Sequence, residues 1–194
     1  MIKKRLSQVF TALQKGFTLD TFEGKFPVYQ EIGVPAALSN TAVLAATTLA
    51  DGETTTVTAG ITNPDVYRNV IVKGNASGIT GTVIINGTDW AGRDITEYIT
   101  ANGSSAVLGV KAFKTIKDII LPARNAGENT ISIGVGNAFG LCRDIEVSDD
   151  VVSVYVDGVR EAADSVSTAN STVTVTTVPN ATRRYHISFL TIYF

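Results

Sequence analysis

Charged and reactive side chains are scarce in this sequence. Only 18% of the 194 residues are charged, whereas about a quarter are charged in an average soluble domain, and the net charge is -2. Lysine and arginine are not gathered into the dense basic field that binds phosphates, which argues against a nucleic-acid partner. No apolar run reaches the roughly 18 to 20 residues of a membrane-spanning helix, so we expect no membrane partner.

The chain contains one histidine, His186, and one cysteine, Cys142. A single cysteine cannot form an internal disulfide, and one ligand of each kind is too few for a zinc site. No Ser/His/Asp or Cys/His arrangement can be assembled around His186 from the sequence. We therefore predict no catalytic residues, no metal, no cofactor and no enzymatic activity. Cys142 is interpreted as an inert, buried thiol in preference to a reactive one.

The abundant residues are those of β-sheets and tight turns. Thr, Val, Ile, Gly and Asn are plentiful, and branched side chains suit a pleated surface. Val152, Val154 and Val156 alternate with polar or aromatic neighbours, and turn pairs such as Asn86-Gly87 separate such segments. The predicted strands are residues 41–49, 54–58, 67–73, 80–86, 94–100, 107–121 (bent or interrupted), 130–136, 151–157, 171–178 and 184–194.

This spacing predicts a mainly β protein. The first seven strands recur about every 12 residues without helices between them, which predicts an antiparallel, immunoglobulin-like β-sandwich at residues 41–142. The last three predict a smaller C-terminal β unit at residues 143–194, which either stands alone or extends the sandwich. Its final strand is apolar on both faces and needs cover on both sides, from its own fold or from a partner. The glycine-rich stretch 134–140 is interpreted as a strand-end turn, because its spacing does not match the dinucleotide-binding fingerprint.

Residues 1–40 differ from the rest of the chain. Apolar residues at helical spacing predict an amphipathic helix of about 14 residues, and the aromatic, proline-containing segment after it predicts an extended arm. A helix this short is marginal in water, so it needs a surface to pack on. That surface belongs either to the protein's own sandwich or to another subunit. For the second case, the predicted partner-binding residues are Ile2, Leu6, Val9, Phe10, Leu13, Phe17, Phe22 and Phe26.

Two further segments are candidates for ligand binding. The only tryptophan, Trp90, lies in a predicted loop, where an exposed indole would stack on a sugar ring and a buried one would fill the core. Four acidic residues also lie close together: Asp144, Glu146, Asp149 and Asp150. Their oxygens suit calcium, but the spacing does not match the helix–loop–helix calcium pattern, so a solvated linker is the default interpretation.

Several of these segments together resemble a recurrent β-domain of tailed-bacteriophage virion proteins. The similar segments are residues 69–74 (NVIVKG), 78–83 (GITGTV), 87–97 (GTDWAGRDITE), 111–116 (KAFKTI), 136–141 (GNAFGL), 156–162 (VDGVREA) and 172–174 (TVT). The resemblance covers about residues 35–194. Such proteins are virion structural components, and some are head decoration or head-fibre proteins. The resemblance therefore implies a capsid decoration (cement) protein that stabilises the head lattice, located in the virion after assembly in the cytoplasm of the bacterial host.

The partners implied by the resemblance are the major capsid protein or other virion proteins. The sparse charge and the two-sided apolar final strand also predict a homo-oligomer. Two alternatives remain: a tail or head–tail connector component, and a carbohydrate-binding module on the virion surface. Copy number per particle separates decoration from a connector, and glycan binding that depends on Trp90 would identify the module.

Overall fold

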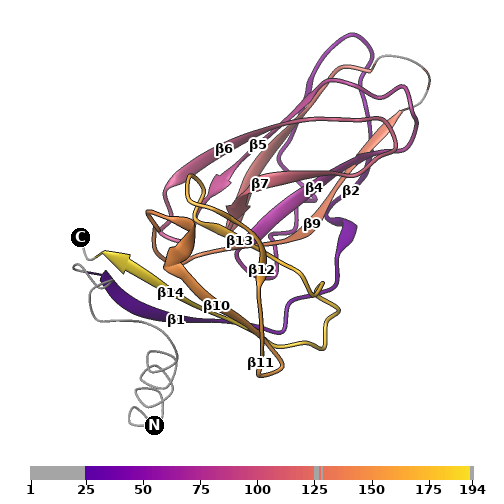
Figure 1. Ribbon diagram of the computed structural model, residues 1–194. Helices are drawn as coiled ribbons and strands as arrows, with labels where there is room; N and C mark the ends of the chain where they lie inside the picture. The colour runs from indigo at the N-terminus through magenta and orange to yellow at the C-terminus, as the bar shows by residue number, and fades with distance from the viewer. Residues whose placement is uncertain (1–24, 125–126, 128, 193–194) are drawn as a thin grey trace.

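A computed structural model describes residues 25–124, 127 and 129–192, and this part of the chain is mainly β (Figure 1). Every pairing between its strands is antiparallel. The predicted helix at the N-terminus lies outside the described residues. In chain order the elements are β1 (Lys25–Gly33), β2 (Ser39–Thr48), β3 (Thr55–Val57), β4 (Arg68–Gly74), β5 (Thr82–Thr88), β6 (Asp94–Thr100), β7 (Val107–Phe113), β8 (Thr115–Leu121), β9 (Thr130–Gly140), the 3-10 turn η2 (Ser148–Asp150), β10 (Val151–Val156), β11 (Val159–Glu161), β12 (Ala163–Ser167), β13 (Thr172–Val175) and β14 (Tyr185–Ile192).

The strands follow the alternation in the sequence. In β5, for example, Val83 and Ile85 are fully buried, while Ile84 between them is partly exposed on the other face. The segment predicted to be bent or interrupted divides into β7 and β8 at Lys114, whose backbone N–H donates to the carbonyl of Thr88. The prediction of a mainly β, antiparallel fold is confirmed.

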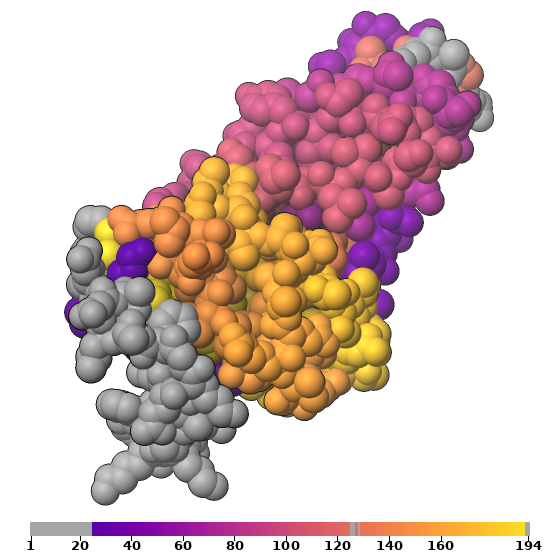
Figure 2. All heavy atoms as spheres, in the orientation of Figure 1, coloured from indigo at the N-terminus to yellow at the C-terminus, as the bar shows by residue number. Residues whose placement is uncertain are grey.

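The strands form three sheets, which we name by their position. The distal sheet has the order β3-β8-β5-β6, and the terminal sheet has the order β1-β14-β10-β11. Between them lies the shared sheet, with the order β12-β13-β9-β4-β7 and with β2 also paired to β9. Figure 2 shows the distal strands at one end of the molecule and the chain after residue 141 at the other.

Two hydrophobic cores lie along the shared sheet. The distal core packs β2, β4, β7 and the start of β9 against the distal sheet, and its fully buried side chains include Val83 and Ile133. The terminal core packs β13 and the end of β9 against β10 and β14, around Phe139, Tyr185 and Phe189. β9 therefore contributes to both cores, because its residues 131–135 enter one and Phe139 enters the other.

The glycine-rich stretch 134–140 belongs to β9, so its interpretation as a strand-end turn was wrong. Its glycines are there because neighbouring groups approach the strand too closely for a side chain. A Cβ on Gly134 would lie 1.6 Å from the backbone oxygen of Ser39, and one on Gly140 would lie 1.9 Å from the Tyr67 ring. The missing side chains allow β2 and Tyr67 to pack directly on the strand that joins the two cores.

Residues 25–33, which fall within the predicted arm, form strand β1 in the terminal sheet. β1 pairs with β14 from Lys25↔Ile192 to Gly33↔Tyr185, and its Val28 packs against the terminal core. The Lys25 ammonium is also 2.7 Å from an oxygen of Asp150. Burial acts to raise the pKa of Asp150, but hydrogen bonds from Lys25 and from the backbone at 146 and 147 outweigh it and lower that pKa.

The distal core with its strands and the terminal core with its strands are called here the two halves of the molecule. A buried arginine links them at their boundary. Arg68 is fully buried, and its Nε donates to the carbonyl of Gly136 at 2.8 Å, midway along β9. Its Nη1 donates to the carbonyl of Ala36 and to a carboxylate oxygen of Asp65, both at 3.0 Å. Ala36 lies in the segment that connects β1 to β2. The guanidinium group therefore ties the β1–β2 connection to β9, next to Tyr67.

Candidate functional site

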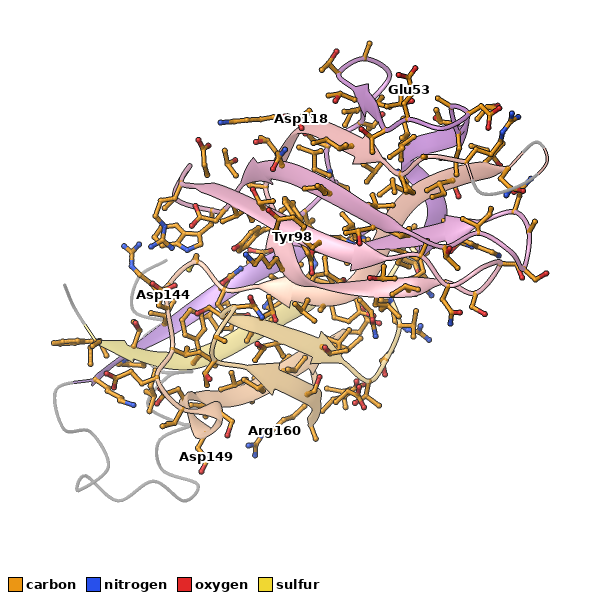
Figure 3. The ribbon with its side chains drawn as sticks, turned by 90° about the horizontal axis from the view of Figure 1, so that it is seen from above. Glu53, Tyr98, Asp118, Asp144, Asp149 and Arg160 are labelled. Atoms are coloured by element: carbon orange, nitrogen blue, oxygen red, sulfur yellow. The ribbon has the colours of Figure 1, made fainter. Side chains whose placement is uncertain are left out.

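A hollow of about 160 Å³ opens at the boundary between the two halves. Its walls come from segments that are far apart in the sequence: the residue before β4, the β5–β6 loop, strand β7, the segment after β9 and the β12–β13 turn. The lining residues are Tyr67, Asp89, Trp90, Arg93, Ile95, Lys111, Ala112, Asp144, Ala169, Asn170 and Ser171. Figure 3 places Asp144 where the chain passes between the halves, well away from Glu53.

Asp89 organises the β5–β6 loop that carries Trp90. One oxygen of its buried carboxylate accepts from the backbone N–H groups of Ala91 and Arg93, and the other accepts from the Arg93 Nε at 2.6 Å. Burial alone would raise the pKa of Asp89, but these hydrogen bonds from Arg93 and Ala91 lower it. All these contacts are within the loop, so Asp89 acts as a local brace that orients Trp90 and Arg93.

Trp90 is half-buried and held between polar neighbours. The Arg143 guanidinium lies 4.9 Å from the centre of the indole ring, and the Arg93 guanidinium lies 6.0 Å from it. The indole Nε1 is buried without a hydrogen-bond partner among the described residues. Beside it, burial raises the pKa of Tyr67 to about 12, the nearby Asp89 charge adds to that rise, and a hydrogen bond with the backbone of Trp90 opposes it. Tyr67 is therefore a neutral phenol at the base of the hollow.

The opposite wall belongs to the terminal half. The exposed Asp144 carboxylate lies 3.7 Å from an Arg93 nitrogen, and the same oxygen is 3.4 Å from the Ser171 hydroxyl that donates to it. Asn170 donates its amide N–H to the Ser167 hydroxyl at 3.1 Å, a bond that does not use its amide oxygen. Lys111, on β7 of the shared sheet, donates its ammonium to the carbonyl of Thr96 in β6. The hollow thus combines two carboxylates with two cations and an amide.

The sequence predicted Trp90 as a candidate but none of the partners that the fold brings to it. Asp144 was considered only as a member of an acidic cluster, and that cluster does not converge on one point. Asp150 is buried against Lys25, Asp144 faces the boundary, and Figure 3 shows Asp149 well apart from Asp144. No group of three or more metal-binding side chains occurs in residues 25–192 as described.

The other singled-out residues lie elsewhere. His186 packs edge-on against Tyr29, with ring centres 5.1 Å apart, and burial lowers its pKa. Cys142 is half-buried, its backbone N–H donates to Gln30, and burial raises the pKa of its thiol. Phe26, the one predicted arm contact within the described residues, lies in β1 and is 48% exposed. The remaining predicted arm contacts precede residue 25.

A second surface feature is an apolar row across the outer face of the distal sheet. The register places Ile84 of β5 between Ile120 of β8 and Tyr98 of β6, and all three point away from the distal core. Ile84 and Ile120 are partly exposed, and Tyr98 is 70% exposed. Tyr98 is labelled in Figure 3. Isolated exposed apolar residues are ordinary, whereas these three lie side by side on neighbouring strands and form a candidate contact surface.

Glu97, the neighbour of Tyr98, ties β6 to β7. Its carboxylate accepts from the backbone N–H groups of Val110 and Lys111, while its Oε2 is buried without a partner among the described residues. Burial raises the pKa of Glu97, against the lowering effect of these hydrogen bonds. The contact closes the gap between the edges of the distal and shared sheets and holds the strand that carries Tyr98.

No family model, no curated protein and no solved structure matches this chain. Among the described residues, no helix has the length and apolar character required to cross a bilayer.

Proposed function

We propose that this protein is a structural component of a larger assembly and, following its resemblance to tailed-phage virion proteins, a capsid decoration (cement) protein. The observation that carries the proposal is the apolar row Ile120–Ile84–Tyr98 on an otherwise polar sheet face. No histidine among the described residues lines the hollow, and the one contact there between a hydroxyl and a possible base, Ser171 to Asp144, is long at 3.4 Å. A binding role therefore fits the described residues better than a catalytic one.

In this proposal the contacts with neighbouring capsid subunits come from two places. The distal sheet packs its apolar row against the lattice, and residues 1–24 supply the helix-in-groove anchor that their apolar spacing predicts. Contacts of ordinary size, about 800 Å² per partner, become strong when they are repeated over a shell. We also propose that the fold is an immunoglobulin-like sandwich and that the protein assembles as a homo-oligomer.

The test is a decoration assay with purified phage heads and full-length protein. Tyr98→Glu places a charge in the apolar row, and Val159→Glu introduces the same charge at an exposed valine, 66% accessible, in β11. Both variants are expected to fold, because both sites are on the surface. We expect Tyr98→Glu to lose occupancy on the heads and Val159→Glu to retain it. Equal occupancy for the two variants would refute the proposed contact.

Copy number on purified particles decides the position in the virion. Hundreds of copies per particle support decoration, whereas a dozen or fewer indicate a connector or tail component. The anchor is tested by deleting residues 1–24 alone, because β1 begins at Lys25 and pairs with β14. A truncated protein that melts like the full chain but no longer joins heads supports the anchor, and full occupancy without residues 1–24 contradicts it.

A further inference from the structure

The hollow beside Trp90 carries a second inference, which goes beyond the structural role. We propose that it is a carbohydrate-binding site that takes one neutral sugar ring. At about 160 Å³ it is smaller than the ~300 Å³ at which pockets for drug-sized ligands begin, so it suits a single small ring with the rest of a glycan outside. It also lies on the boundary between the two halves, a common place for ligand sites.

The charges that line the hollow favour an uncharged ligand. Asp89 and Asp144 balance Arg93 and Lys111, and the two aspartates each lie close to Arg93. An anionic ligand would meet the carboxylates, and a cationic ligand would meet the guanidinium and ammonium groups. A neutral ligand rich in hydroxyl groups meets neither penalty.

The hydrogen-bonding groups match hydroxyls, which donate and accept. The amide oxygen of Asn170 and the second carboxylate oxygen of Asp144 lie outside the contacts described above, so both are acceptors for a ligand hydroxyl. Arg93, with a side chain 59% exposed, provides donors on the facing side.

The remaining lining is apolar, as the C–H face of a sugar requires. Ile95, Ala112 and Ala169 line the hollow together with the rings of Tyr67 and Trp90. Because Arg143 lies over the indole, we place the sugar against the edge of Trp90 and the neighbouring Tyr67 ring. This arrangement differs from the open stacking platform that a loop tryptophan suggests from sequence.

The experiment uses the full chain and its own reporter, since Trp90 is the only tryptophan. The methyl glycosides of glucose, galactose and mannose are titrated while Trp90 fluorescence and saturation-transfer NMR of the sugar are followed. Glucuronic acid and glucosamine are the anionic and cationic comparisons. We expect saturable binding of at least one neutral glycoside in the millimolar range, and weaker or no binding of the two charged sugars.

Two variants locate the site. Asp144→Ala and Asn170→Ala are each expected to weaken binding tenfold or more, and Asp149→Ala is the matched control for the first. Asp144 and Asp149 are both exposed, so folding is expected to survive, and circular dichroism of each variant checks this.

No response to any neutral glycoside, undiminished binding by the folded Asp144→Ala and Asn170→Ala variants, or a preference for a charged sugar would each overturn the proposal. Head decoration by the same variants is measured separately, so a failure here is distinct from a failure of the virion proposal.

Discussion

Replacing Arg68 by methionine tests whether one buried guanidinium holds the two halves together. Methionine keeps much of the volume of the side chain but removes its donors to Gly136, Ala36 and Asp65. The fold should survive, because both hydrophobic cores remain complete without this residue. We expect a clear loss of stability without loss of β structure.

The magnitude follows from the groups that the substitution leaves behind. The buried carbonyl of Gly136 loses a charged donor, at about 1–3 kcal/mol for an acceptor left without a bond in the interior. Ala36 is exposed, so water can replace the donor that its carbonyl loses. Asp65 is 34% exposed, so water replaces part of its lost partner and the ion pair adds little. The burial cost of the guanidinium, whose Nη2 has no partner among the described residues, offsets part of the loss. The net expectation is about 2 kcal/mol, or about 4–8 °C in melting temperature for a chain of this size.

Urea unfolding followed by circular dichroism and by Trp90 fluorescence gives the free energy of unfolding. Arg160→Met is the control, because the exposed Arg160 guanidinium also donates to a carbonyl, that of Val152 at 3.0 Å (Figure 3). We expect a change of about 0.5 kcal/mol or less in this control. A loss below about 1 kcal/mol for Arg68→Met, or a gain, would refute the view that this brace stabilises the boundary.

Three further predictions concern stability. Glu97→Gln is expected to be stabilising relative to the native protein at neutral pH, with an advantage that shrinks as the pH falls toward 4.5. Burial raises the folded pKa of Glu97 above its ordinary value of 4.5, so the native protein loses stability as the pH rises from 4.5 through the folded pKa, and a melting series from pH 4 to 8 measures this. Asp150→Asn is expected to cost about 2 kcal/mol of stability at pH 7. Because the folded pKa of Asp150 is lowered, the difference in stability between the variant and the native protein should vanish as the pH falls through 3.8 and below. A difference that stays constant across an acid titration would contradict the Lys25 contact as its cause. Gly134→Ala is expected to cost about 3 kcal/mol or more, because a Cβ would meet the Ser39 carbonyl, whereas Gly78→Ala, with nothing within 4 Å of the added carbon, should be close to neutral in the same unfolding assay.

Strand positions were largely predictable because alternation and turn residues are local signals. β4, β5, β6 and β8 lie within one or two residues of the predicted segments or divide them at Lys114. The exceptions have non-local causes. The glycines of β9 look like a turn in the sequence, and only the approach of Ser39 and Tyr67 explains why a strand needs them.

The pairing of β1 and the residues around the hollow were not predictable either, because both depend on contacts between segments far apart in the sequence. Nothing in residues 25–33 indicates that their hydrogen-bonding partner is β14, because that pairing joins opposite ends of the chain. Trp90 could be singled out as the only tryptophan in a turn-rich segment, but Asp144 and Asn170 reach it only through the packing of the two halves. The Asx turn at Asp89 and the contact of Arg143 with the indole of Trp90 cannot be predicted from residue spacing.

The pairing of β1 with β14 sets an order of events during synthesis. The distal core draws on residues 43–135 and can close while the ribosome is still translating the rest. The terminal sheet cannot, because β1 leaves the ribosome early and waits for the last strand, with Val28 and Ile32 exposed in the meantime. Such long-range pairing is slow and leaves an edge open to other chains. When several ribosomes translate one messenger RNA, the β1 strand of a chain whose own β14 is not yet made could therefore pair with the β14 strand of a neighbouring, more complete chain.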